Sequence, residues 1–150
     1  MIKICFICHG NICRSPMAEF VFKNKIRNLN SQNKFLIVSR STSHEEVGND
    51  MHDGVKDILN KNNIVYTKHI STPLVKEDYD KYDFFICMDD NNVRNTLKIF
   101  TSDNQKKVFK LLKNKDVKDP WYTLNFSETY NDIDIGTDKL IEMFKNDINN

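Results

Sequence analysis

The chain has 150 residues, of which 39% are hydrophobic and 29% charged, a composition typical of one globular domain spanning residues 1–150. Its 22 basic and 21 acidic residues give a formal net charge of +1, which argues against broad binding to nucleic acid or to an anionic membrane. No apolar run approaches the roughly 20 residues of a membrane span, and residues 1–20 carry no export-signal pattern. We therefore expect a cytoplasmic protein with no membrane contact, whose four cysteines are reduced thiols.

Short apolar runs alternate with amphipathic segments along the chain. The first run, Ile2–Cys8, predicts a strand buried on both faces, and Ser15 and Pro16 predict the N-cap and first position of a helix with Glu19 in its first turn. The further predicted elements are, in chain order, a strand over 35–38, a helix over 53–61, a strand over 84–88, a helix over 91–100 capped by Asp89 and Asp90, a strand over 107–112 and a helix from 127 onward. This alternation predicts an α/β fold with a parallel sheet covered by helices on both faces.

The segment Cys8-His9-Gly10-Asn11-Ile12-Cys13-Arg14-Ser15 joins the first strand to the first helix. Five residues between Cys8 and Arg14 suffice to wrap backbone N–H groups around a tetrahedral anion, and the helix start adds donors and positive potential. Gly10 and Asn11 tolerate the left-handed backbone that such a tight loop needs. We therefore expect a phosphate-binding loop, in which the substrate-binding residues are His9, Gly10, Asn11, Ile12, Cys13 and Ser15.

Cys8 is the candidate nucleophile of this loop. A thiol near a helix N-terminus and an arginine is ionised at neutral pH, so we expect a thiolate that faces the phosphorus atom. The Arg14 guanidinium offers a planar fork for two phosphate oxygens, and the Ser15 hydroxyl can donate a hydrogen bond to the sulfur. The alternative is that Cys8 is only a small buried side chain that ends a strand, but Arg14 would then have no purpose at a helix N-terminus, where a cation is unfavourable.

The stretch CHGNICRSPMAE, from Cys8 to Glu19, resembles the phosphate loop of the low-molecular-weight protein tyrosine phosphatases. The resemblance extends over nearly the whole chain: Ser39 lies where the family has a serine that hydrogen-bonds the loop asparagine, here Asn11, and Cys87-Met88-Asp89 and Asp119-Pro120-Trp121-Tyr122 match two further family motifs. It implies a four-stranded parallel sheet flanked by helices and a phosphotyrosine protein phosphatase that uses no metal or organic cofactor. Its partners would be a phosphotyrosine-containing protein or peptide and the product, inorganic phosphate. We assume a monomer.

Asp119 is the candidate general acid and base. Departure of an aryl oxygen needs a proton, and Pro120 fixes Asp119 in an extended conformation. We expect Trp121 and Tyr122 to shelter the carboxyl from water and to stack on the phenyl ring of the substrate, which favours phosphotyrosine over phosphoserine. By itself, Asp-Pro is also a common turn starter and the aromatic pair could merely cover a sheet edge; the resemblance favours the catalytic interpretation.

The opposite wall departs from the family, which often has an aromatic residue there. Glu45 and Glu46 occupy this segment here and predict an acidic rim, which would alter substrate preference. Ile12 is apolar where relatives acting on phosphoarginine carry threonine, and it therefore fits an aryl ester better.

The remaining cysteines and histidines have less specific roles. Cys5 and Cys8 have metal-knuckle spacing but point to opposite faces of a strand, so we expect no metal site. The family implies a reversible disulfide between Cys8 and Cys13 that protects the nucleophile, whereas Cys13 could also be a packing thiol. We place Cys87 in the core and the remaining histidines in loops. For His69 a surface role is favoured over the alternative, that it positions the phosphate loop or fills its flank.

Two other functions use the same loop. An arsenate reductase would need two further thiols to relay a disulfide, and beyond the loop only Cys87 is a candidate. A phosphoryl carrier that uses Cys8 as an acceptor without turnover would have no use for Asp119 as a leaving-group acid. Hydrolysis of phosphotyrosine is therefore the favoured function.

Overall fold

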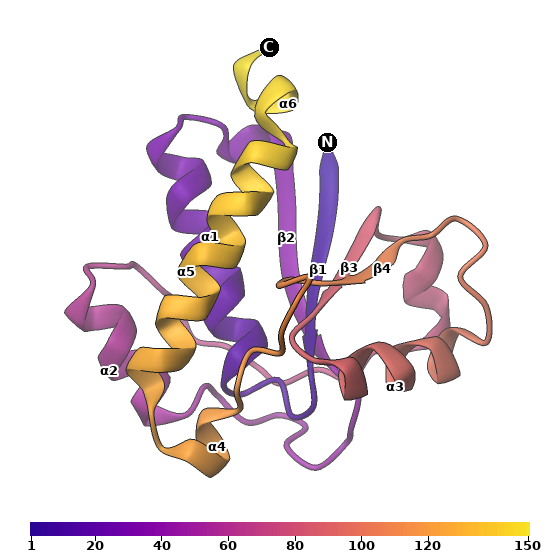
Figure 1. The fold of residues 1–150 in the computed structure, drawn as a ribbon, viewed down its shortest axis with the longest axis horizontal. Helices are drawn as coiled ribbons and strands as arrows, with labels where there is room; N and C mark the ends of the chain where they lie inside the picture. The colour runs from indigo at the N-terminus through magenta and orange to yellow at the C-terminus, as the bar shows by residue number, and fades with distance from the viewer.

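Four parallel strands form the centre of the computed structural model, which describes residues 1–150 (Figure 1). They are β1 (Ile2–Cys8), β2 (Phe35–Ser41), β3 (Phe84–Cys87) and β4 (Val108–Lys110), in the spatial order β2-β1-β3-β4. Each neighbouring pair is parallel, which confirms the predicted four-stranded sheet. β2 ends at Ser41 and not at Val38, and β4 is shorter than the predicted run 107–112.

Helices cover both faces of this sheet, with most of the helical mass on one of them. α1 (Arg14–Asn28), α2 (Asp53–Lys61) and α5 (Phe126–Met143) pack against one another on the first face, where Phe6 and Ile86 point into the larger core. α3 (Asp90–Phe100) and the 3-10 helix η2 (Lys76–Asp80) lie against the second face, where Ile7 and Phe85 belong to a smaller core. The shorter elements are the 3-10 helix η1 (Gln32–Lys34) and the helices α4 (Pro120–Thr123) and α6 (Lys145–Asn149).

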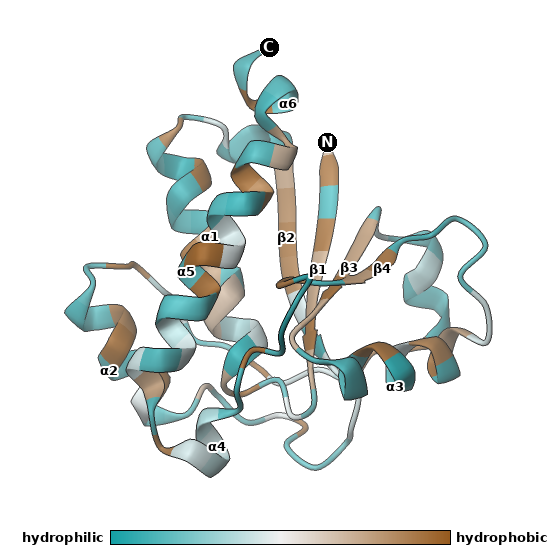
Figure 2. Ribbon diagram, in the orientation of Figure 1, coloured by the Kyte–Doolittle hydropathy of each residue, from teal (hydrophilic) through white to brown (hydrophobic).

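Apolar residues are concentrated in the sheet. The strands are largely brown in Figure 2, whereas the connecting loops and α6 are mostly teal. The last five residues of β1 are all buried because helices cover both faces of this central strand. No helix combines the length and the apolar composition needed to cross a membrane.

The start of α1 differs from the prediction. The helix begins at Arg14 with Cys13 as its N-cap, so Ser15 and Pro16 occupy the second and third helical positions, and Glu19 lies beyond the first turn. Proline is tolerated at the third position because the N–H groups of the first turn have no intrahelical acceptor. The consequence is that the phosphate-loop segment runs directly into the helix, with Arg14 inside its first turn.

The chain crosses from one side of β1 to the other at the carboxyl end of the sheet. β1 is followed by α1 and β2 on one side, and the next strand, β3, pairs with β1 on its other side. Ligand sites of open parallel sheets lie at such a switch point, beyond the carboxyl ends of the strands. Cys8, the last residue of β1, stands at this point of the sheet.

Candidate active site

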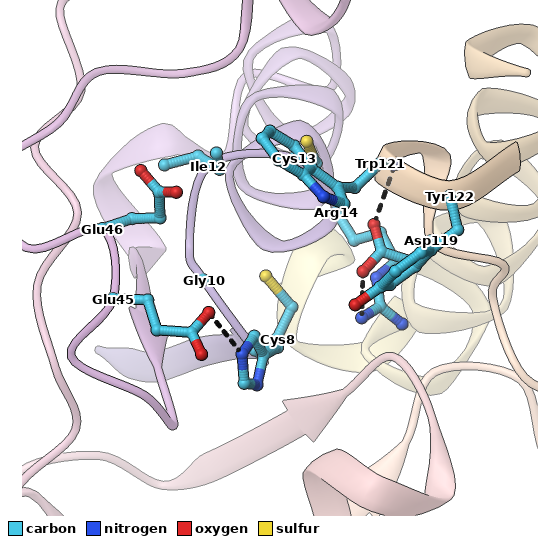
Figure 3. A pocket seen from close by; sticks show the side chains of 11 residues that line it. Cys8, Gly10, Ile12, Cys13, Arg14, Glu45, Glu46, Asp119, Trp121 and Tyr122 are labelled. Carbon is cyan, nitrogen blue, oxygen red and sulfur yellow. Dashed lines mark hydrogen bonds and ion pairs between the residues drawn. The ribbon is translucent and has the colours of Figure 1, made fainter. Parts of the chain in front are cut away.

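The sulfur of Cys8 lies inside the curve of the loop that follows β1 (Figure 3). The Asn11 backbone N–H donates a hydrogen bond to Cys8 Sγ over 3.3 Å, and Ser15 Oγ lies 3.0 Å from the same sulfur. Cys8 is buried, but it lines a cavity of about 110 Å³ that opens between the loop and the segment after β4. A buried sulfur with two hydrogen-bond donors at the mouth of a helix is suited to carry negative charge.

Asn11 determines the shape of the loop. Its backbone has φ +58°, the left-handed conformation that the sequence predicted for it, whereas Gly10 does not adopt a positive φ. Its Nδ2 donates to Ser15 Oγ over 2.8 Å and to Ser39 Oγ over 2.9 Å, and its Oδ1 accepts from the Thr72 N–H over 3.0 Å. Because Ser15 Oγ accepts from Asn11, its own hydrogen is free to point at Cys8 Sγ.

The same hydrogen-bond chain extends from Ser39 into α1. Ser39 Oγ donates to Glu19 Oε1 over 2.7 Å, and Glu19 Oε2 accepts from Lys23 Nζ over 2.6 Å. Ser39 and Glu19 are both buried, so these polar atoms are satisfied within the protein. The predicted contact between Ser39 and Asn11 is therefore present and is anchored by a carboxylate.

A segment after α2 supports the loop backbone from outside. His69 Nε2 lies 2.7 Å from the Asn11 carbonyl oxygen, and Ser71 Oγ donates to the Gly10 carbonyl over 2.8 Å. His69 is only 8% exposed and contacts the loop, so the favoured surface role is wrong and the alternative, a residue that positions the loop, is the one observed. The prediction failed because no periodicity marks this segment, whose position depends on its contacts with the loop.

Arg14 is held by groups from two other strand ends. Its Nη1 donates to Asp89 Oδ2 over 2.6 Å and to the Val117 carbonyl over 3.0 Å, and its Nη2 donates to Asp119 Oδ2 over 3.3 Å. Only 4% of the Arg14 side chain is exposed. Burial lowers the pKa of Arg14, but the negative charges of Cys8, Asp119 and Asp89 outweigh burial and leave its pKa above the ordinary value. The guanidinium is therefore a fixed positive charge beside the sulfur.

Asp119 lies opposite the loop, between Arg14 and the start of α4. It has the extended backbone expected before Pro120, and its Oδ1 accepts the Trp121 N–H over 3.1 Å as the N-cap of α4. The Asp119 side chain is partly sheltered, since 24% of it is exposed, although the neighbouring rings are themselves open to solvent, Trp121 at 54% and Tyr122 at 81%. Hydrogen bonds from Arg14 and Trp121 hold the Asp119 side chain in place.

The cavity has two unlike walls. Trp121 and Tyr122 stand on one side, and Glu45 and Glu46 line the other, so the acidic rim predicted from the sequence is present (Figure 3). His9 Nε2 lies 3.0 Å from Glu45 Oε2 across the mouth of the loop. Of the remaining residues predicted to bind substrate, those that line the same cavity are Gly10, Ile12 and Cys13.

Burial keeps the other thiols protonated. Burial, reinforced by the negative charge of Cys8, raises the pKa of Cys13 to about 12, so Cys13 is a neutral thiol at pH 7. Burial likewise raises the pKa of Cys87 to about 12, and Cys87 lies in the core as predicted. Cys5 and Cys8 belong to separate hydrophobic clusters on opposite faces of the sheet.

Three site residues were missed or only partly described from the sequence. Asp89 was expected only as a helix cap, yet it also forms the shortest contact to Arg14. This role could have been inferred, because Asp89 follows the strand next to β1 and the carboxyl ends of parallel strands meet at one edge. His69 was considered as a support of the loop but not favoured. His52, whose main-chain N–H donates to the Ile12 carbonyl over 2.9 Å, carries no comparable sequence signal.

Comparisons with known proteins agree with this geometry. The family model described as low molecular weight phosphotyrosine protein phosphatase matches residues 3–150. The chain is 37% identical over 156 residues to the low molecular weight protein-tyrosine-phosphatase PtpA of Staphylococcus haemolyticus, covering 99% of this chain and 97% of that protein. It is 36% identical over 154 residues to PtpA of Staphylococcus aureus, with the same coverage.

Solved structures give the same result. SP-PTP, a low molecular weight protein tyrosine phosphatase from Streptococcus pyogenes, superposes with a TM-score of 0.88 at 38% identity over 95% of this chain and 93% of that one. YfkJ from Bacillus subtilis superposes with a TM-score of 0.93 at 29% identity over 98% of this chain and 96% of that one. Both matches span nearly the whole length of each chain.

Proposed function

The chain belongs to the low molecular weight phosphotyrosine protein phosphatase family, and we propose that Cys8, Arg14 and Asp119 carry out its reaction. It is a phosphotyrosine protein phosphatase, a hydrolase of phosphoric monoesters. The observation that supports these roles is the arrangement of the three side chains around one cavity: a hydrogen-bonded sulfur, a buried guanidinium and a carboxyl within reach of that guanidinium.

The loop from His9 to Ser15 binds the phosphate group of the substrate. Its backbone N–H groups and the helix N-terminus supply donors and positive potential for a dianion. Arg14 has five N–H groups, of which three donate to protein acceptors, so two are available for phosphate oxygens. These donors stabilise the negative charge, and the reaction therefore needs no metal or organic cofactor.

The reaction has two steps. In the first, the Cys8 thiolate attacks phosphorus, the bond from phosphorus to the tyrosine oxygen breaks, and Asp119 gives its proton to that oxygen. In the second, Asp119 takes a proton from water, the water oxygen attacks phosphorus, and the phosphorus–sulfur bond breaks to return the thiolate and inorganic phosphate. The Ser15 hydroxyl donates a hydrogen bond to the sulfur as it leaves.

Arg14 links phosphate binding to the release of the Asp119 carboxyl, the general acid. Its Nη2 donates to Asp119 Oδ2 over 3.3 Å. A bound phosphate dianion competes with Asp119 for the guanidinium, which frees the carboxyl to carry the proton that the leaving oxygen needs. Binding of the substrate thus prepares the acid.

Trp121 and Tyr122 form the wall on which the phenyl ring of phosphotyrosine stacks, and the apolar Ile12 side chain contributes to the cavity. Their exposure makes the wall accessible to a tyrosine on a protein surface. We propose a monomer in the cytoplasm, a reducing compartment that suits four free cysteines.

Cys13 has a second proposed role, as the thiol that forms a reversible disulfide with Cys8. Peroxide oxidises the Cys8 thiolate to a sulfenic acid, and the Cys13 thiol displaces water to form the disulfide. Because the pKa of Cys13 is about 12, this condensation becomes faster as pH rises.

Covalent catalysis is tested with Cys8→Ser. This variant should have no measurable turnover of p-nitrophenyl phosphate in metal-free buffer, because an alcohol at this position is not ionised. Cys87→Ser is the matched control: its sulfur lies 3.7 Å from Thr96 Oγ1 in the core, a contact that serine can keep, and its turnover should be near that of the native enzyme. Native turnover in Cys8→Ser would contradict the mechanism.

The acid is tested with Asp119→Asn, which keeps an acceptor for the Trp121 N–H but has no proton to give. We expect kcat/KM for phenyl phosphate, which reports only the steps up to departure of the phenol, to fall by roughly 10²- to 10⁴-fold, the usual contribution of general acid catalysis. The loss on p-nitrophenyl phosphate should be much smaller, because p-nitrophenolate leaves without protonation. Equal losses on both esters would show that Asp119 is not the general acid.

A further inference from the structure

His52 connects the two halves of the active site. It lies between β2 and α2, and its main-chain N–H donates to the carbonyl of Ile12 in the phosphate loop over 2.9 Å. Its Nδ1 accepts the Gly54 N–H over 2.9 Å as the N-cap of α2. Both the loop and the helix thus fix the position of this residue.

The His52 ring contacts the segment that carries the acid. The ring meets the Trp121 ring edge to face, with centroids 5.9 Å apart and planes at 86°. On its other side it stacks on Phe126, at 5.1 Å and 28°. Trp121 in turn donates its backbone N–H to Asp119 Oδ1, so the ring lies one contact away from the acid.

The stack of rings is built closely against α2. A side chain on Gly54 would come within 2.5 to 2.7 Å of three Phe126 ring atoms, so the absence of a side chain is what lets Phe126 approach the first turn of α2. α2 and α4 accordingly both lie at the N-terminal end of α5 (Figure 1). His52 is therefore held on both sides and presents a fixed surface to Trp121.

α4 needs such a support. It has four residues, fewer than a helix requires to be stable by itself, and Leu124 ends it with φ +58°. Trp121 is half exposed, and its ring has one aromatic neighbour, His52. Pro120 is buried and α4 contacts α5, so His52 is the neighbour that fixes the half-exposed Trp121 side of α4, next to the Asp119 cap.

We propose that His52 is a positioning residue for the general acid: its ring supports Trp121 and thereby fixes α4 and Asp119 relative to the phosphate loop. The proposal rests on the function given above for Asp119. It assigns no chemical step to His52, whose effect passes through the acid loop alone. Loss of the ring should therefore impair protonation of the leaving group while phosphate binding is kept.

Two substitutions separate the two roles of His52, the support of Trp121 by its ring and the capping of α2 by its Nδ1. His52→Asn keeps a side-chain acceptor for the Gly54 N–H and removes the ring, whereas His52→Phe keeps a ring and removes the acceptor. We expect His52→Asn to lower kcat/KM for phenyl phosphate by about 10- to 100-fold, the range for a misplaced catalytic group, and to lower kcat/KM for p-nitrophenyl phosphate much less. The inhibition constant of inorganic phosphate should stay within about twofold, because the loop is intact.

His52→Phe should retain the native ratio of the two kcat/KM values and lose only thermal stability. The reverse pattern, with native kinetics in His52→Asn and a changed ratio in His52→Phe, would overturn the proposal in favour of a capping role. Equal losses on both esters, or a weakened inhibition by phosphate, would also overturn it. Asp57→Asn, an exposed position on α2, is the control and should match the native enzyme.

Trp121 is the only tryptophan of the chain, so its fluorescence reports directly on α4. In His52→Asn we expect a red-shifted emission and stronger quenching by acrylamide, and in His52→Phe an emission close to the native one. Native emission in His52→Asn would show that the ring does not hold Trp121 and would overturn the proposal. If the assignment of Asp119 itself were wrong, the native enzyme and Asp119→Asn would already show the same leaving-group dependence, so the two failures are distinguishable.

Discussion

Asn11 links the shape of the phosphate loop to the reactivity of its sulfur. Its left-handed backbone turns the chain so that its own N–H points at Cys8 Sγ, and its amide orients the Ser15 hydroxyl toward the same atom. The second amide hydrogen goes to Ser39, which is anchored on the Glu19 carboxylate. A buried chain of this kind fixes each hydroxyl in one direction, because every donor and acceptor in it already has a partner.

Charge at the rim gives a prediction on peptide choice. Glu45 and Glu46 line the cavity opposite the aromatic wall, and a phosphotyrosine peptide must pass between the two walls. We expect kcat/KM to be higher for peptides with lysine or arginine beside the phosphotyrosine than for peptides with acidic neighbours. The double variant with Glu45→Gln and Glu46→Gln should reduce this ratio by roughly two- to 30-fold, since exposed ion pairs contribute about 0.2–1 kcal/mol each.

The measurement compares two such peptides at low and at high salt. The native ratio should fall with added salt, because exposed charges are screened. Glu77→Gln, on an exposed residue of η2, is the control and should keep the native ratio. A ratio that is the same in the double variant and in the native enzyme would show that the rim does not select peptides.

At the scale of elements, the strands and long helices could be predicted because burial sets their pattern. β1 is an almost continuous apolar run since helices cover both of its faces, and α2 and α3 show one apolar stripe each. The short elements α4 and η2 were not predicted. A helix of four residues has no periodicity to detect, and its formation depends on the Asp119 cap and on contacts with α5.

The packing of α5 against the end of β4 gives a prediction on stability. A side chain on Gly136 would overlap Leu111, whose Cδ2 would lie 2.8 Å from the added carbon. Overpacking costs about 1–3 kcal/mol, more than the roughly 0.5–1 kcal/mol that alanine gains over glycine in a helix. Gly136→Ala should therefore lower the free energy of unfolding in urea by about 1 kcal/mol.

A second substitution, Leu111→Ala, tests whether the overlap between the added methyl group and Leu111 causes this loss of stability. With Leu111→Ala already present, the added methyl group has room, and Gly136→Ala should raise stability by its helix propensity. Ile135→Ala, on an exposed neighbour in α5, is the control for changes in the helix alone. A loss that persists in the Leu111→Ala background would rule out this contact as its origin.

At the scale of the whole molecule, the order of the strands brings the site together. Ile7 pairs with Cys87 in the register of β1 and β3, so Asp89 follows β3 close to the loop that follows Cys8. That Cys8, Arg14 and Asp119 lie around one cavity could be predicted, for Cys8 and Arg14 from the residue types of the loop and for Asp119 from the resemblance to the family. The supports of that site, such as the segment at His69 and the ring of His52, could not, because only the folded chain brings them to the loop.

The buried thiols make the stability of the whole fold depend on pH. Burial raises the pKa of Cys5 above its ordinary value and that of Cys13 and Cys87 to about 12, whereas in the unfolded chain a thiol titrates at about 8.5. Above about pH 9 the unfolded state therefore binds fewer protons than the folded state. The stabilisation is complete below that pH and is lost as pH rises toward 12, by about 1.4 kcal/mol per pH unit for each thiol.

The contribution of one thiol to this pH dependence of stability can be measured with Cys87→Ala. Urea unfolding between pH 9 and pH 11 should give a free energy that falls with pH less steeply than in the native protein, by about 1.4 kcal/mol per pH unit. Val55→Ala, which truncates a fully buried side chain without a titratable group, should lower stability at every pH and keep the native slope. If Cys87→Ala had the native slope as well, Cys87 would ionise equally in the folded and unfolded states, and its burial would not be the source of the alkaline loss of stability.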